Sequence, residues 1–411
     1  MNPTASHQTE DPLAQPQHQA ALDTTTPEHE APATTFTNQG AVPAPQAWPA
    51  ASGPSASEQA FGGTNDKLRP DQHAYLDQIH KTDPAMGDKK ANQIAAESRP
   101  LSQADRDSVI AIQRKISTMK PRRIDDPKNP NLVQIEISFD GTGEDREQTP
   151  DITDSNPARL DEGFEGPKHY EPGVASSPQK GLLGGIANNY EFATGAGFQN
   201  RIDSAYENLV TQINTIKGGN PAAEVVLVLA GFSRGAAEAR AFVNELNKRG
   251  VPVRDSKQQD GSYSQHYATP KVGVMVLFDT VEMTPLDQRD LSIPANVENV
   301  LHLTARDEHR TTFPLTRATD PNHPNDDRIT EVAMPGAHGD VGGGMPNAYS
   351  QISEQIARQY MVNAGVNIKP EAPDQVVDVN DPKLRLHNTG DGMFGMKRPV
   401  MGNHNPDPTK Q

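Results

Sequence analysis

The sequence contains no cysteine, so disulfide bonds and cysteine-ligated zinc sites are excluded. The absence of thiols leaves both reducing and oxidising compartments open to the protein. No apolar run approaches the roughly 20 residues that span a bilayer. The N-terminal segment MNPTASHQTEDPL has neither the basic nor the apolar part of a signal peptide. If the protein leaves its cell, we therefore expect a dedicated machine to carry it.

Aromatic and hydrophobic residues are scarce in the 411-residue chain, at 5% and 34%. These fractions are low for a chain that is folded throughout, so we expect much of it to be tail or linker. Basic residues are also outnumbered, with 38 Lys and Arg against 54 Asp and Glu and a net charge of -16. This balance argues against a nucleic-acid partner held by phosphate contacts and fits a neutral or amphiphilic substrate better.

Composition and hydrophobic periodicity divide the chain into four regions. Residues 1–65, rich in Pro, Ala, Thr, Gln and Ser, are predicted to be a disordered tail. Residues 66–120 are predicted to form a small helical segment. Residues 131–365 alternate apolar strands with helical patterns, which predicts an α/β domain with a mostly parallel sheet and helices on both faces. Residues 366–411 are polar and proline-rich, so we place the end of the core near residue 365.

The clearest helix of the second region begins at Ser102. Ser102-Gln-Ala-Asp105 resembles a capping box, and apolar residues follow it at helical spacing, namely Val109, Ile112, Ile116 and Met119. We expect this helix to pack on the main domain. A docking segment for secretion or a chaperone is the alternative.

Four predicted strands end in polar or glycine-containing loops: 132–139, 224–230, 271–278 and 329–334. A further strand over 297–305 is followed by the charged cluster Arg306–Arg310, which resembles a solvated edge. Residues 144–200 are polar and rich in glycine, and we predict a long loop of the kind that forms lids or binding surfaces.

The strand at 224–230 runs into Gly231-Phe232-Ser233-Arg234-Gly235, which has the pattern G-x-S-x-G. An alanine-rich helical pattern follows directly. A strained strand-to-helix turn of this kind exposes its serine as a nucleophile, and glycines two positions away let strand and helix pass closely. The alternative is an ordinary tight turn with a capping serine.

Two further loops supply an acid and a base. Asp279 follows the strand 271–278, and His338 lies in a glycine-rich loop after the strand 329–334. Ser233, Asp279 and His338 occur in the chain order of α/β-hydrolases. Asp340 is a competing acid, because it lies two residues from the histidine. His338 and Asp340 could also ligate a metal, but no further histidine or acid nearby completes a zinc or calcium pattern, so we expect no metal and no cofactor.

The expected oxyanion donors are backbone N–H groups. Arg234 opens the helix after the serine, and Gly141 or Thr142 lies in the loop after the strand 132–139. An ordinary glycine turn is the alternative for that second loop.

Four blocks together resemble a known family: FDGTG at 139–143, GFSRGAAEARAF at 231–242, FDTV at 278–281 and PGAHGDVGGG at 335–344. They are similar, in the same order, to the α/β-hydrolase family of bacterial type VI secretion lipase effectors, the Tle phospholipases, and their relatives. The resemblance implies a carboxylic-ester hydrolase acting on phospholipids, with Ser233, Asp279 and His338 at the family's triad positions.

The resemblance also implies partners and a place of action. We expect a phospholipid or other ester substrate, peripheral membrane contact, a secretion-apparatus component and a cognate immunity protein. The protein would be made in the bacterial cytoplasm and act at the target cell's membrane or periplasm. Two alternatives stay open: an esterase for small soluble esters or acylated proteins, and a non-catalytic binding or adaptor protein on the same fold.

Overall fold

The computed structural model describes residues 98–147, 154–174, 197–257, 263–282, 289–344, 348–373, 375–387 and 398–401. The predicted tail and the first part of the predicted helical segment, up to residue 97, lie outside this described part of the chain. Both therefore stay predictions. No helix among the described residues has the length and apolar character that crossing a membrane requires.

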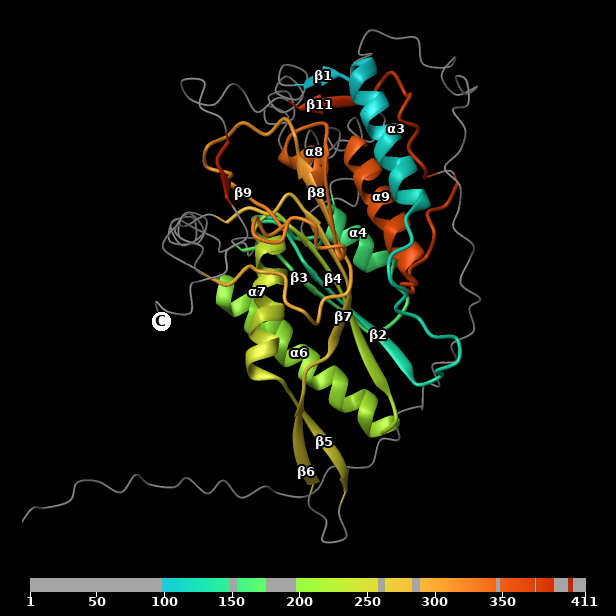
Figure 1. The fold of residues 1–411 in the computed structure, drawn as a ribbon, viewed down its shortest axis with the longest axis vertical. Coiled ribbons are helices and arrows are strands. Elements are labelled where there is room, and N and C mark those ends of the chain that lie inside the picture. Colours follow the sequence, from blue (N-terminus) through green and yellow to red (C-terminus); the bar gives the residue numbers. More distant parts are fainter. Residues whose placement is uncertain are drawn as a thin grey trace, which may run out of the picture. The chain divides into compact units, whose positions relative to one another are not determined.

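The described part of the main sheet contains six parallel strands in the spatial order β10-β8-β7-β4-β2-β3 (Figure 1). The central strands β4 and β7 are almost entirely apolar, as expected for parallel strands covered on both faces. In chain order the strands are β2 (Leu132–Phe139), β3 (Lys168–Glu171), β4 (Glu224–Phe232), β7 (Lys271–Phe278), β8 (Val300–Ala305) and β10 (Ile329–Met334).

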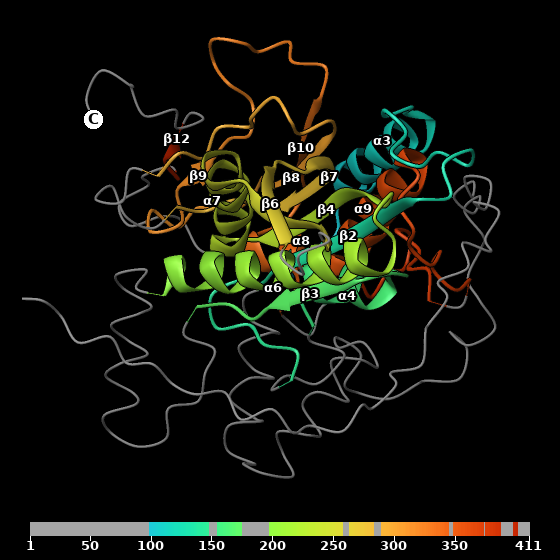
Figure 2. The same cartoon turned by 90° about the horizontal axis from the view of Figure 1, so that it is seen from below.

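Helices cover both faces of this sheet, and two hydrophobic clusters mark the two faces. Alternate side chains of β4 and β7 pack with α3, α4 and α9 on one face and with α6 and α7 on the other. Figure 2 shows α6 lying across the sheet with α7 beside it. This arrangement confirms the predicted fold class. The helices are α3 (Gln103–Thr118), α4 (Asn156–Gly163), α6 (Phe198–Gly219), α7 (Arg234–Arg249), α8 (His338–Gly342) and α9 (Tyr349–Ala364).

The predicted helix after Ser102 is α3, and it packs on the main domain. Ser102 Oγ accepts a hydrogen bond from the Asp105 N–H at 3.2 Å, and Asp105 Oδ2 accepts one from the Ser102 N–H at 2.9 Å, which completes the capping box. Val109 and Ile116 are fully buried in the cluster that contains α9, and Figure 1 shows the two helices side by side.

Short strand pairs join segments that are distant in the sequence. β1 (Ser98–Pro100) pairs with β11 (Arg385–His387), and β9 (Leu315–Thr316) pairs with β12 (Val400–Met401). A third pair, β5 (Val251–Lys257) with β6 (Tyr263–Ala268), forms a hairpin. The first two pairs bring the C-terminal part of the described chain back to the carboxyl edge of the main sheet.

The structure departs from the sequence pattern in two places. The predicted long loop over 144–200 contains α4 and β3, because the strand KHYE is polar and short and gives no apolar signal. The core also extends beyond residue 365, where the pattern places its end: Leu384 and Leu386 are fully buried among residues of α3 and α9.

All main-sheet strands run in the same direction, so their carboxyl ends meet at one edge. Asp140, Ser233, Asp279, Arg306 and Pro335 are the first residues after β2, β4, β7, β8 and β10. The loops expected to carry chemistry therefore converge on one edge of the sheet.

Candidate active site

Ser233 lies in a strained turn between β4 and α7. Its φ of 58° and ψ of -122° are unfavourable for a residue with a Cβ. The turn is held by its neighbours: the Ser233 N–H donates to the Phe278 carbonyl at 2.9 Å, and the Ser233 carbonyl accepts from the Val281 N–H at 3.2 Å. The end of β7 thus fixes the serine in a conformation that the sequence pattern predicts for a nucleophile.

The two glycines of the motif are required by close backbone contacts. A Cβ on Gly231 would lie 2.7 Å from the Ala236 Cα, and one on Gly235 would lie 2.3 Å from the Asp140 carbonyl oxygen. These distances are too short for any side chain, so glycine at both positions lets α7 approach β4 and β2.

The structure brings Ser233, Asp279 and His338 together from three loops. The His338 Nε2 lies 2.7 Å from the Ser233 Oγ, and its Nδ1 lies 2.6 Å from the Asp279 Oδ2. All three residues are buried, and Asp279 is completely so. His338 begins the short helix α8, whereas the sequence pattern places it in a glycine-rich loop.

Asp279 accepts four hydrogen bonds on its two carboxylate oxygens. Besides the imidazole, they come from the Ala305 N–H at 2.8 Å and from the Arg398 Nη1 and Nη2 at 2.9 and 2.7 Å. Burial by itself would raise the pKa of Asp279, but the hydrogen bond from His338 and the charge of Arg398 hold this pKa well below its usual range. The carboxylate is therefore ionised across the physiological pH range.

Aromatic rings enclose the imidazole of His338. The Phe232 ring centroid lies 4.7 Å from it, and the Phe313 ring meets it edge-on at 5.0 Å. The Arg310 guanidinium lies 3.6 Å from the centre of the Phe313 ring and forms an ion pair with Glu308. These contacts limit rotation of the imidazole and keep water from much of its surface.

Three carboxylates hold the backbone of the histidine loop. The N–H groups of Gly336, Ala337 and His338 donate in turn to Asp307 at 3.0 Å, to Asp340 at 3.0 Å and to Glu308 at 3.2 Å. The charged cluster 306–310 is therefore more than the solvated edge that the sequence pattern indicates: Glu308 is buried and Asp307 supports the loop.

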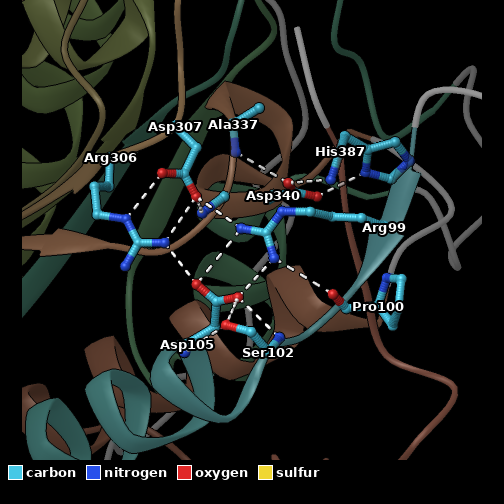
Figure 3. A network of polar contacts seen from close by, with 10 residues as sticks. Arg99, Pro100, Ser102, Asp105, Arg306, Asp307, Ala337, Asp340 and His387 are labelled. Atoms are coloured by element: carbon cyan, nitrogen blue, oxygen red, sulfur yellow. Dashed lines mark hydrogen bonds and ion pairs between the residues drawn. The ribbon is translucent and has the colours of Figure 1, made fainter.

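Asp340, the competing acid, contacts His387 instead of His338. Its Oδ1 lies 2.7 Å from the His387 Nδ1, and its Oδ2 accepts the His387 N–H at 2.7 Å. Figure 3 shows how this pair continues into a wider network, in which Asp105 of α3 receives hydrogen bonds from Arg99 and Arg306. Arg99 in β1 and His387 in β11 thus bond to Asp307 and Asp340, two of the carboxylates that hold the histidine loop.

The expected oxyanion donors differ in their surroundings. Arg234 is the first residue of α7, a position whose N–H lies outside the intrahelical ladder. The Gly141 N–H donates to the Asp140 Oδ1 at 2.7 Å, so it is already engaged. Of the two predicted alternatives for the second donor, the Thr142 N–H is therefore the better candidate.

Sequence reasoning missed Arg398, His387 and Glu308. Arg398 and His387 lie in the C-terminal region, which has the composition of an extension and no local motif. Glu308 lies in a run of charges whose pattern suggests exposure. Among the described residues, no group of three histidine or acidic side chains is arranged to hold a metal ion.

The family model described as "T6SS, Phospholipase effector Tle1-like, catalytic domain" matches residues 134–271 and 254–364. These segments together cover more than half of the chain and include the loops that carry Ser233, Asp279 and His338. No curated protein sequence matches the chain significantly.

Solved structures also resemble this chain. An uncharacterised protein from Pseudomonas aeruginosa is 20% identical with a TM-score of 0.42, and the match covers 67% of this chain and 51% of that one. The Tle1 effector, solved bound to the VgrG spike, is 21% identical with a TM-score of 0.38, covering 57% and 54%. Carboxyl esterase 2 from Tuber melanosporum is 9% identical with a TM-score of 0.32, covering 73% and 99%. The chain thus spans about half the length of the first two proteins.

Proposed function

Because the chain belongs to the family of type VI secretion phospholipase effectors with a Tle1-like catalytic domain, we propose that it is a serine esterase that cleaves acyl esters of phospholipids. The observation that carries this proposal is the hydrogen-bonded series from Ser233 through His338 to Asp279. In this series the base contacts the nucleophile on one side and the acid on the other, which is the arrangement that acyl transfer to a serine requires.

In the first half of the proposed reaction, the His338 Nε2 takes the proton of the Ser233 hydroxyl as the oxygen attacks the ester carbonyl. Asp279 stabilises the imidazolium that forms and keeps its Nδ1 proton directed at the carboxylate. The N–H groups of Arg234 and Thr142 bind the developing oxyanion. His338 then gives its proton to the leaving alcohol, here the lysophospholipid, and an acyl-serine remains.

In the second half, His338 removes a proton from a water molecule that attacks the acyl-serine. The same oxyanion donors serve this step. Collapse of the tetrahedral intermediate releases the fatty acid, and the serine regains its proton from the imidazolium. All proton transfers in the cycle pass through one nitrogen, the His338 Nε2.

We further propose that the protein reaches its target through a type VI secretion apparatus, since the family consists of effectors of that system. Contact with a component of the apparatus, with a target membrane and with an immunity protein belongs to the same proposal. A phospholipid substrate requires the site to meet a lipid surface, and this contact would be peripheral.

The test is release of free fatty acid from phospholipid vesicles and, in parallel, from a short-chain soluble ester. Replacing Ser233 with alanine should reduce both rates by about 10⁴-fold or more, since the nucleophile is lost. Ser353→Ala is a matched control: Ser353 is buried in α9, and its hydroxyl has no hydrogen-bond partner in the described structure. That variant should keep full activity.

The outcomes distinguish the phospholipase from the two alternative functions, a soluble-ester esterase and a non-catalytic binding protein. Serine-dependent release from vesicles supports the phospholipase, whereas serine-dependent turnover of the soluble ester alone indicates a small-ester or protein-acyl esterase. If neither substrate is cleaved and a fluorophosphonate does not label Ser233, the enzyme assignment is wrong and a binding role on this fold takes its place.

A further inference from the structure

Arg398, in the C-terminal part of the chain, forms an ion pair with the buried side chain of Asp279. Its two terminal nitrogens lie 2.9 and 2.7 Å from the two carboxylate oxygens of Asp279, in the parallel geometry that a guanidinium makes with a carboxylate. The side chains of both residues are buried, with exposed fractions of 6% and 0%. The two residues are 119 positions apart in the sequence, so only the tertiary fold creates this pair.

Contacts through β9 and β12 hold Arg398 beside Asp279. The carbonyl of Thr280, the residue after Asp279, accepts the N–H of Thr316 in β9 at 2.9 Å. Strand β9 then pairs with β12, which directly follows Arg398 and Pro399. The Arg398 Nε also donates to the carbonyl of Phe313, whose ring packs against the imidazole. The guanidinium therefore has one well-defined position relative to the aspartate.

This position has two consequences for the histidine. First, the bidentate contact from the Arg398 guanidinium prevents rotation of the Asp279 carboxylate, so Oδ2 stays directed at the imidazole. Second, the positive charge of Arg398 offsets part of the carboxylate charge that would otherwise stabilise a protonated His338. A histidine that acts as a base must be neutral before the reaction, so the balance of charge beside the imidazole bears directly on its role.

We propose that Arg398 is a positioning residue of the catalytic Asp279–His338 pair, setting the orientation of the carboxylate and offsetting part of its charge beside the imidazole. The proposal rests on the serine-esterase function proposed above. It makes the segment that contains β12 part of the active site, although this segment lies outside residues 134–364, which match the family model.

Other charged groups face the same pair and have to be considered in any pH profile. Glu308 accepts the His338 N–H and is itself paired with Arg310, so its charge is compensated. Asp340 lies two residues from the histidine, and its carboxylate is bonded to His387. Arg398 is bonded to both carboxylate oxygens of Asp279, so its substitution changes the environment of the aspartate directly.

The experiment compares Arg398→Gln and Arg398→Lys in the full chain, with kcat/KM for a soluble ester measured from pH 4 to 9. Glutamine removes the charge and the bidentate contact, so the acid limb should move to higher pH, and kcat should fall by about 10- to 100-fold. Lysine keeps the charge but not the bidentate contact. Its acid limb should stay at the wild-type pH while kcat still falls.

Arg385→Gln is the matched control. Arg385 lies in β11 and bonds the Ser98 side chain and carbonyl, so its loss weakens the C-terminal segment without touching Asp279. Its acid limb should coincide with that of the wild type. Thermal unfolding of all variants identifies any loss of folded protein. For Arg398→Ala, guanidinium ion at low millimolar concentration should restore part of kcat, whereas sodium chloride at equal ionic strength should not.

A readout without substrate separates this proposal from the proposed function. The proton on the His338 Nδ1 is expected as a far-downfield resonance in the proton NMR spectrum, and its titration midpoint should rise in Arg398→Gln by the same amount as the acid limb. If wild type lacks serine-dependent turnover but the midpoint rises, the esterase function fails and the role of Arg398 stands. If folded Arg398→Gln has an unmoved midpoint, the proposal is overturned.

Discussion

The two acids near the histidine can be distinguished by replacing each with asparagine. Asp279 is surrounded by four N–H donors, two on each oxygen, from His338, Ala305 and Arg398. An amide has one acceptor oxygen and one NH2 group, so in either orientation the NH2 of asparagine faces two donors. Asp279→Asn should therefore favour the wrong tautomer of the histidine and leave Arg398 without an anion.

The expected magnitudes follow from these contacts. Loss of the His338 tautomer that carries its proton on Nδ1 should lower kcat by about 10⁴-fold, the effect known for an aspartate in this role. The unsatisfied buried donors should lower the free energy of unfolding by about 3 kcal/mol or more, because a buried cation loses its partner. Activity and stability should thus both fall strongly in this variant.

Asp340→Asn should behave differently. Its amide oxygen can still accept the N–H groups of Ala337 and His387, and its NH2 can donate to the His387 Nδ1 if that ring changes tautomer. We expect a loss of about 1–2 kcal/mol in unfolding free energy, since charge-assisted bonds become neutral. kcat should fall by less than about 10-fold, because Asp279 still contacts the His338 Nδ1.

The assay is steady-state hydrolysis of a short-chain ester, combined with urea unfolding of the same preparations. Rates are compared only at temperatures where each variant is folded, so that loss of structure is not counted as loss of chemistry. The reasoning would be refuted if Asp340→Asn lost far more kcat than Asp279→Asn while remaining folded. In that case Asp340 would be the acid of the site.

Two further predictions concern the scaffold. Gly235→Ala should destabilise the protein by at least about 2 kcal/mol in urea unfolding and lower kcat, because a Cβ there would meet carbonyl groups at the end of β2. A Cβ on Gly219 would have nothing within 4 Å, so Gly219→Ala should be neutral or slightly stabilising in the same experiment. Burial opposes ionisation of Glu331, but His302 and Arg317 lower the pKa of this residue to about 2. Since its unfolded pKa lies near 4.5, its stabilisation is complete above about pH 5 and is lost as the pH falls toward 2, so Glu331→Gln should lose less Tm than wild type between pH 6 and 3.

Much of the site was accessible to sequence reasoning because its signals are local. The valine-rich run before Gly231 identifies a strand buried on both faces, and the glycines at 231 and 235 identify a turn whose backbone contacts exclude side chains. Asp279 and His338 each follow a strand, and parallel strands end at one edge of a sheet. Residue type and strand order together therefore predict that these side chains meet.

The acid was the ambiguous choice. Two carboxylates are available to His338 on sequence grounds: Asp279, which fits the chain order of α/β-hydrolases, and Asp340, which lies two residues from the histidine. Position on helix α8 decides otherwise, because the Asp340 side chain turns toward the backbone of Ala337 and toward His387. The carboxylate that faces the Nδ1 comes from another strand end.

The sequence by itself determined the fold class, the strand-to-helix turn at Ser233 and the set of candidate catalytic side chains, since these depend on periodicity and on residues a few positions apart. Only the tertiary structure decided which acid contacts the histidine and which groups support it. Glu308, His387 and Arg398 come from segments whose composition resembles exposed chain. The burial of His387 and Arg398 accompanies pairing between β1 and β11 and between β9 and β12, and such long-range contacts leave no periodic trace in the sequence.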